Sequence, residues 1–117
     1  MDKYIVLENY TLREVMEKLE ENHQRVVLVK NEIGKIVGIL SQGDIIRALL
    51  SGSNVYTQAQ TIMRPSFIYL TKYDLSKAYH IFKEKKVSLV PVLNEDAELV
   101  SVITLNEIFH YLEGKDA

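Results

Sequence analysis

The chain contains no cysteine among its 117 residues. It therefore has no disulfide, no thiol nucleophile and no cysteine ligand for zinc or an iron–sulfur cluster. No apolar run approaches the ~18 residues of a membrane-spanning helix, and the start of the chain is too polar for a secretory signal peptide. We expect a cytoplasmic protein, or a piece of one, that is stabilised by an ordinary apolar core.

An excess of charge of one sign is also missing. The 14 basic and 16 acidic residues leave a net charge of −2, whereas a broad phosphate-binding surface needs an excess of Lys and Arg. We therefore expect neither nucleic acid nor a membrane as a partner. The 47% of apolar and 26% of charged residues are typical of a globular protein, and the length is that of one domain.

The residues of a catalytic site are missing as well. The sequence contains no nucleophile–base–orienter set, no phosphate-loop pattern and no pair of carboxylates with separate acid and base roles. His23, His80 and His110 stand alone, without a second ligand at metal-binding spacing. We therefore predict no catalytic residue, no metal ligand and no catalytic cofactor, so the chain is not expected to be an enzyme.

What the chain does contain is a repeat. An offset of 63 places residues 11–50 on residues 74–113 without a gap, with nine identities over forty positions. The identical pairs include Val27/Val90, Val29/Val92, Asn31/Asn94 and Ile45/Ile108. We infer two copies of one supersecondary unit.

Each copy shows the same order of periodicities. Apolar residues at helical spacing over residues 11–22 and 74–85 predict a helix. Two short apolar runs with a four-residue turn between them then predict a β-hairpin, at residues 26–40 and 89–103. A second helix closes each unit, and a short strand precedes the first helix. The fold class is therefore α+β, with two strand–helix–strand–strand–helix units. A lone unit of ~50–55 residues would bury only ~60% of its chain's surface on folding, so the two are expected to share a core.

The repeat resembles the CBS (cystathionine β-synthase) domain pair, or Bateman module. The most specific segment is Gly38-Ile39-Leu40-Ser41-Gln42-Gly43-Asp44-Ile45, which is similar to the family pattern of Gly, an apolar residue, Ser or Thr, and Asp three residues later. With Arg47 after it, the segment is similar to CBS pairs attached to sugar-phosphate nucleotidyltransferases or isomerases. A second trait is the apolar-Pro-Val strand at Val90-Pro91-Val92.

The resemblance implies two pseudo-twofold related β-α-β-β-α repeats, packed sheet to sheet as one module. Their expected bounds are residues 1–52 for repeat 1, 53–66 for the connection and 67–114 for repeat 2. It also implies that AMP, ADP or ATP binds between the repeats and regulates an attached or partner enzyme domain. The residues expected to contact this ligand are Ser41, Asp44, Val37, Ile39, Arg25, Val90, Pro91, Thr104 and Glu107.

Physical reasons support two of these contacts. Ser41 comes where a strand turns into a helix, and a helix N-terminus favours a phosphate. Asp44 offers an acceptor-only carboxylate, which suits the two hydroxyls of a ribose. In the second copy, Ser101 replaces the glycine and Glu107 the aspartate, so we expect the second site to be weaker.

A plainer interpretation stays open at the same residues. Ser41-x-x-Asp44, like Thr11-x-x-Glu14, is also the pattern of a helix capping box. Arg47 lies three residues after Asp44, where an ion pair within the helix competes with phosphate binding. The alternative function is therefore a ligand-free structural module that dimerises a larger enzyme, such as a sugar-phosphate nucleotidyltransferase. In either case a homodimer is expected.

Overall fold

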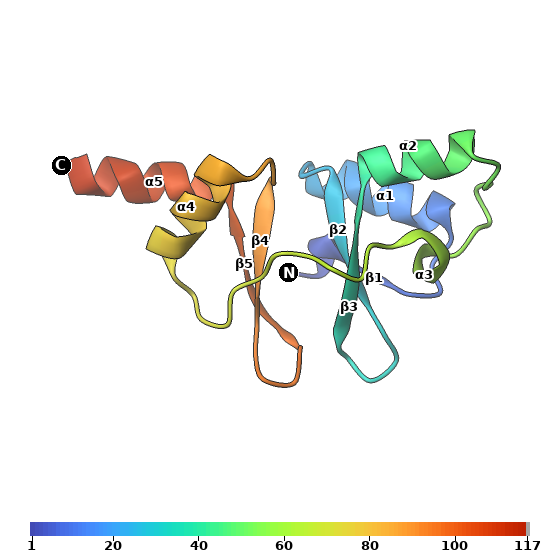
Figure 1. Ribbon diagram of the computed structural model, residues 1–117, viewed down its shortest axis with the longest axis horizontal. Helices are drawn as coiled ribbons and strands as arrows, with labels where there is room; N and C mark the ends of the chain where they lie inside the picture. The colour runs from blue at the N-terminus through green and yellow to red at the C-terminus, as the bar shows by residue number, and fades with distance from the viewer. Residues whose placement is uncertain (117) are drawn as a thin grey trace. The chain divides into compact units, whose positions relative to one another are not determined.

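The computed structural model describes residues 1–116, which divide into two units, Met1–Phe67 and Ile68–Ala117. In the first unit a short 3-10 helix, η1, precedes the first strand (Figure 1). The elements of this unit are η1 (Asp2–Tyr4), β1 (Ile5–Leu7), α1 (Leu12–Asn22), β2 (Val26–Lys30), β3 (Ile36–Ser41), α2 (Gln42–Leu50) and α3 (Ala59–Ile62).

The first unit has a three-stranded sheet in the order β1-β2-β3. β1 runs parallel to β2, and β2 runs antiparallel to β3 with Leu28 opposite Ile39. β3 alternates between buried and half-buried residues, whereas β2 is buried over four consecutive residues. The central strand is thus covered on both faces, as its continuous β-branched and leucine run predicts.

The core of this unit joins the sheet to its helices. Leu12 and Val15 of α1 pack with Ile45 of α2 and with strand residues such as Val27 and Leu40. The 3.6-residue spacing of the apolar side chains is the reason, since it places them on one face of each helix. The predicted helix over residues 11–22 is therefore confirmed, with Thr11 as its N-cap.

Both predicted hairpin turns are also confirmed. The side-chain oxygen of Asn31 accepts hydrogen bonds from the N–H groups of Ile33 and Lys35. Asn94 does the same for Asp96 and Glu98 in the second hairpin. An asparagine side chain that bonds to the backbone two residues on stabilises such a turn, so this repeated residue has a structural role.

The second unit contains α4 (Leu75–Glu84), β4 (Leu89–Leu93), β5 (Leu99–Thr104) and α5 (Leu105–Asp116). β4 and β5 form an antiparallel pair. The expected third strand is reduced to one parallel bridge between Leu70 and Val92. The N–H of Leu70 donates to Pro91 at 2.9 Å, and its carbonyl accepts from Leu93 at 2.8 Å, while Ile68 and Tyr69 are exposed. The predicted first strand of this unit is therefore wrong as a full strand, and the sheet has two strands, β4 and β5.

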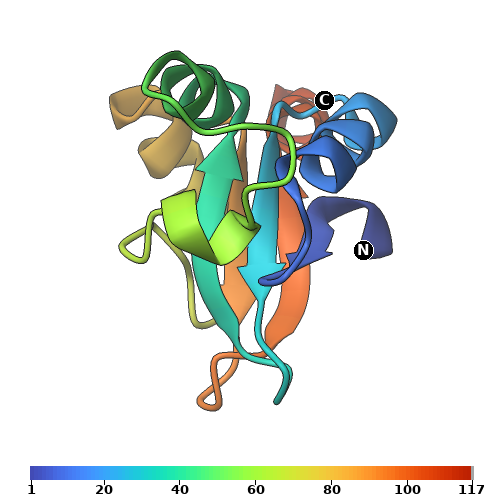
Figure 2. The same cartoon turned by 90° about the vertical axis from the view of Figure 1, so that its right-hand side faces the viewer.

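The residues expected as a connection contain a helix that the sequence analysis did not predict. Figure 2 shows this short α3 in front of β3, and the two elements are in contact. Ala59 at its start is fully buried in the core of the first unit. Beyond it, Arg64 pairs with Ile39 of β3 through two backbone hydrogen bonds, both of 2.9 Å. Residues 59–64 are therefore an integral part of the first unit.

Candidate functional site

Ser41 and Asp44 lie where β3 ends and α2 begins. Ser41 is the N-cap of α2, and its hydroxyl oxygen accepts a hydrogen bond from the Asp44 N–H at 3.1 Å. The Asp44 carboxylate returns the interaction, since its Oδ2 accepts from the Ser41 N–H at 2.9 Å. This reciprocal pair is a capping box, so the structural interpretation of this motif is confirmed.

Two arginines also bind the Asp44 carboxylate. Arg47, one turn on in α2, donates from Nη2 to Oδ1 at 2.8 Å. Arg64, on the connection after α3, donates from Nε to Oδ2 at 3.2 Å. The Asp44 side chain is only 9% exposed, whereas those of Arg47 and Arg64 are 69% and 58% exposed. The expected ion pair with Arg47 is confirmed, and the sequence analysis missed Arg64.

These contacts set the acidity of Asp44. Burial by itself raises the pKa of the carboxyl, but the hydrogen bonds from Ser41 and Arg47 and the positive charge of Arg64 together outweigh it. The pKa of Asp44 therefore lies below its ordinary value. At neutral pH the site presents a carboxylate that is charged, held in one orientation and unable to donate a proton.

The strand residues expected to contact a base lie on β3 and β4. Val37 and Ile39 are half-buried on β3, and Ile39 carries the backbone pair with Arg64. Val90 and Pro91 lie in β4 and are buried. All four are apolar, but only Val37 and Ile39 keep part of their surface exposed, whereas Val90 and Pro91 are fully buried.

Arg25 lies in the turn before β2 and is exposed. Its φ of +62° places it in the left-handed region, which is uncommon for a residue with a side chain. Its carbonyl accepts the N–H of Gln42 at 2.9 Å. This N–H is one of the first donors of α2, so Arg25 and the capping box already satisfy two of the groups expected to hold a phosphate.

The matching position in the second unit has a different partner. Glu107 accepts a hydrogen bond from the hydroxyl of Tyr73 at 2.6 Å and a longer one from the Thr104 N–H at 3.4 Å. The bond to Glu107 raises the pKa of Tyr73, with burial and the carboxylate charge adding to it. A phenol thus contacts the acidic residue here, where arginines do so in the first unit.

Tyr73 is another residue that the sequence analysis missed, although a signal for it exists. The offset of 63 also pairs it with Tyr10, but Tyr10 packs against the core of its own unit. No comparable signal marks Arg64, because it approaches Asp44 from 20 residues along the chain.

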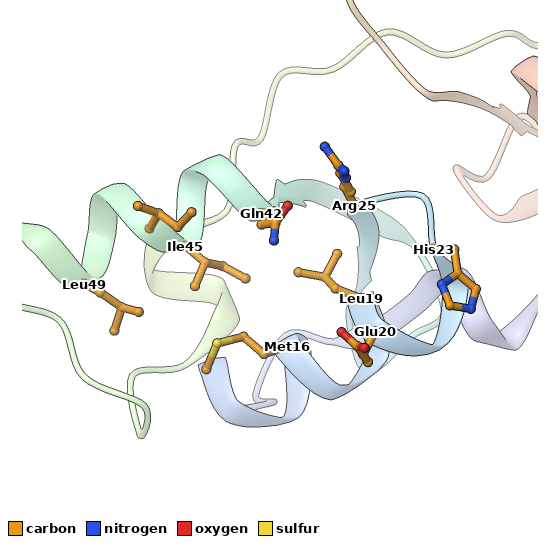
Figure 3. A pocket seen from close by; sticks show the side chains of 9 residues that line it. Met16, Leu19, Glu20, His23, Arg25, Gln42, Ile45 and Leu49 are labelled. Carbon is orange, nitrogen blue, oxygen red and sulfur yellow. The ribbon is translucent and has the colours of Figure 1, made fainter.

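The first unit also contains a hollow of about 480 Å³ between α1 and α2. Figure 3 shows Met16 and Leu19 of α1 facing Ile45 and Leu49 of α2 across it. Glu20, His23, Arg25 and Gln42 line it as well. The hollow is therefore apolar along the helices and carries polar groups at one end.

Neither a metal site nor a membrane span is found within the described residues 1–116. In this part of the chain no group of three or more His, Asp and Glu side chains is placed to hold a metal ion. Over the same residues, no helix combines the length and the apolar character needed to cross a membrane.

Comparison with known families gives a match over most of the chain. The family described as CBS domain matches residues 1–51 and 59–114. Among curated proteins, the chain is 28% identical over 111 residues to the UPF0053 protein sll1254 of Synechocystis, covering 94% of this chain and 32% of that protein. It is 23% identical over 107 residues to the polyamine export protein of Haemophilus influenzae, covering 91% and 25%. The chain thus spans about a quarter to a third of the length of these relatives.

Solved structures show the same fold. The putative acetoin utilization protein AcuB from Vibrio cholerae has a TM-score of 0.81 at 24% identity, over 96% of this chain and 83% of that one. The CBS domain protein PAE2072 from Pyrobaculum aerophilum, complexed with AMP, has 0.74 at 22%, over 94% and 90%. The cytosolic domain of the Mg²⁺ channel MgtE, in complex with ATP, has 0.75 at 24%, over 93% and 45%.

Proposed function

Because this chain belongs to the CBS domain family, a family of regulatory rather than catalytic modules, we propose that it senses an adenine nucleotide and regulates the protein to which it is attached or bound. AMP, ADP and ATP are the proposed ligands. The complexes of PAE2072 with AMP and of MgtE with ATP support this class of ligand. The setting we propose is the cytoplasm.

One observation carries the proposal, namely the orientation of the Asp44 carboxylate. The capping box with Ser41 aligns it at the start of α2, and its lowered pKa keeps it ionised. An ionised carboxylate accepts hydrogen bonds from both hydroxyls of a ribose. The Ser41 hydroxyl and the positive end of α2 then favour the phosphate, with Arg25 as a further cation.

The other ligand contacts remain proposals. We assign Val37 and Ile39 to one side of the base; contact of the base with Val90 and Pro91, which are fully buried, stays a prediction from the sequence. Thr104 and Glu107 are the matching pair of the second repeat, but Glu107 is longer than Asp44 and is bonded to Tyr73. We therefore propose that the first motif is the stronger of the two.

Isothermal titration with AMP, ADP and ATP tests this assignment. Asp44→Ala removes charge-assisted hydrogen bonds worth roughly 1.5–3 kcal/mol, which corresponds to a loss of affinity of about ten- to a hundredfold. Glu107→Ala is the matched control and should have a clearly smaller effect. Equal losses, or a larger loss for Glu107→Ala, would show that the first motif is not the main site.

A thermal-shift panel tests the ligand class itself. It should include AMP, ADP, ATP, cyclic dinucleotides and S-adenosylmethionine. A ligand present at 100 times its Kd stabilises the folded protein by ~2.7 kcal/mol, which is readily measured. A response to the adenine nucleotides supports the proposal, and a panel without any response would favour the structural alternative.

The structural alternative, a dimerisation module, has its own supporting observation. Leu50 at the end of α2 is 83% exposed and Ile46 is 52% exposed, and both belong to the helix that borders the hollow. Exposed apolar patches mark interaction surfaces. We propose that this surface pairs two copies of the chain, with or without nucleotide. The attached protein need not be the sugar-phosphate enzyme expected from the sequence, since one relative is an exporter.

A further inference from the structure

We propose that Arg64 is a displaceable clip: it holds the connection between the repeats on the first repeat until the vicinal diol of a ligand takes its place on Asp44. This inference rests on the nucleotide binding proposed above and adds a regulatory consequence to it. The connection would thereby respond to occupancy of the site.

Three hydrogen bonds of Arg64 and the packing of Met63 hold the connection at this point. The N–H and the carbonyl of Arg64 each form a 2.9 Å hydrogen bond with the backbone of Ile39 on β3. The guanidinium of Arg64 reaches Asp44 at 3.2 Å. The preceding Met63 lies directly on Gly38, where a Cβ atom would be only 2.6 Å from the methionine sulfur. The backbone pair with Ile39 thus attaches the connection to β3, and the ion pair with Asp44 attaches it to α2.

The acceptor capacity of Asp44 decides what a ligand must displace. Each carboxylate oxygen has about two lone-pair sites. Oδ2 already accepts from the Ser41 N–H and from Arg64 Nε, while Oδ1 accepts from Arg47. A diol that donates one hydrogen bond to each oxygen finds a free position on Oδ1 and none on Oδ2. It must therefore remove one of the two donors on Oδ2.

Arg64 is the donor that exchanges at lower cost. The Ser41 N–H donates to Asp44 within the capping box. Breaking this hydrogen bond would leave the Ser41 N–H without its acceptor and weaken the start of α2. The Arg64 side chain is 58% exposed, so water can solvate it as it leaves. Because its cation is exposed to solvent, this ion pair exchanges more readily than the backbone hydrogen bond within the capping box.

Displacement weakens the attachment of the connection. Without its side-chain contact, Arg64 is held by the pair with Ile39 and by the packing of Met63. Pro65 follows and has no N–H with which to continue the pairing along β3. The second unit begins at Ile68, only four residues after Arg64. A more mobile Arg64 therefore increases the mobility of residues 65–67, which lead to that unit.

The clip is tested without ligand by amide hydrogen exchange of the whole chain, followed by NMR. In Arg64→Gln the amides of residue 64 and Ile39 should exchange about fivefold faster than in the wild type. Arg47→Gln is the matched control, because it removes the other arginine from Asp44 but leaves the connection untouched. Equal exchange in Arg64→Gln and the wild type would overturn the clip.

The displacement is tested with AMP and with 2′,3′-dideoxy-AMP, which lacks the diol. Saturating AMP should speed exchange of the Ile39 and Arg64 amides in the wild type and shift the Arg64 Nε–H resonance, whereas the dideoxy compound should do neither. If calorimetry shows that AMP binds and these signals stay unchanged, the clip proposal is wrong and the proposed function stands. If calorimetry shows no binding of any adenine nucleotide, the proposed function is wrong and ligand displacement is overturned with it.

Discussion

At the scale of single residues, Asp44 combines a structural task with the proposed binding task. Its carboxylate caps α2, pairs with two arginines and stays ionised because these contacts outweigh its burial. The same oxygens are the proposed acceptors for a ribose. Stability and ligand binding are therefore linked through one side chain, and its substitutions should affect both.

The pH dependence of stability reports this linkage. The folded-state pKa of Asp44 is lowered, so the stability it contributes is fully present above its unfolded pKa of ~3.9 and is lost as the pH falls through the folded pKa. We expect Asp44→Asn to be less stable than the wild type by about 1 kcal/mol at pH 7. In urea unfolding followed by circular dichroism, this difference should shrink toward pH ~2. A difference of constant size across that range would contradict the assignment.

Gly38 is the second residue whose type has a specific reason. A Cβ atom here would lie 2.6 Å from the Met63 sulfur and 3.1 Å from the Arg64 carbonyl oxygen. We expect Gly38→Ala to lower the free energy of unfolding by about 1–3 kcal/mol, as overpacking commonly does. The same substitution in a Met63→Ala background should cost less, because the sulfur is gone. Equal costs in the two backgrounds would show that Met63 is not the obstacle.

At the scale of elements, α1 and α2 begin with the same device. Thr11 and Ser41 each form a capping box with the acidic residue three positions on. The local pattern therefore predicts a helix start in both cases, and a helix start alone does not identify a ligand site. The α2 motif differs from the α1 motif in the two arginines that bind its carboxylate and in its proposed role in binding.

This pair of caps provides a controlled comparison. Thr11→Ala and Ser41→Ala should each destabilise the protein by about 1 kcal/mol, because each removes a cap. Only Ser41→Ala should also weaken the binding of AMP, measured by calorimetry, since its hydroxyl is the proposed phosphate contact. If both variants, or neither, lose affinity, the α2 cap has no special role in binding.

At the scale of the whole molecule, the exposed apolar residues of α2 suggest how copies associate. Ile46 lines the hollow between α1 and α2, and Leu50 directly follows Leu49, another lining residue, at the end of α2, whereas Ile33, which is 71% exposed, lies on a hairpin turn. Exposure alone thus does not separate an interface from a turn. An exposed apolar residue beside a concave apolar surface is the better candidate for an interface.

We therefore expect a homodimer that depends on α2. In light scattering, the wild type should have about twice the mass of the 13.5 kDa chain, and Leu50→Glu should shift it toward the monomer, since burying an unpaired charge is costly. Ile33→Glu is the control and should leave the mass unchanged. A wild type that stays monomeric over a wide concentration range would refute this assembly.

Much of the fold followed from local patterns. The helical spacing of Leu12 and Val15, the β-branched run of β2 and the asparagine turns were all readable because each depends on residues close in the sequence. The reduced first strand of the second unit and helix α3 were not. Whether a short apolar run pairs as a strand, or a short segment such as Ala59–Ile62 forms a helical turn, depends on packing partners elsewhere in the fold.

By itself, the sequence determined the repeat, the CBS family, the two capping motifs and the pairing of Arg47 with Asp44, because these depend on spacing along the chain. Only the tertiary structure decided that Arg64 shares the same carboxylate, that Met63 requires a glycine at position 38 and that Glu107 is bonded to Tyr73. These partners are 20, 25 and 34 residues apart. No local periodicity encodes such distances, since they arise when the strands and helices pack together.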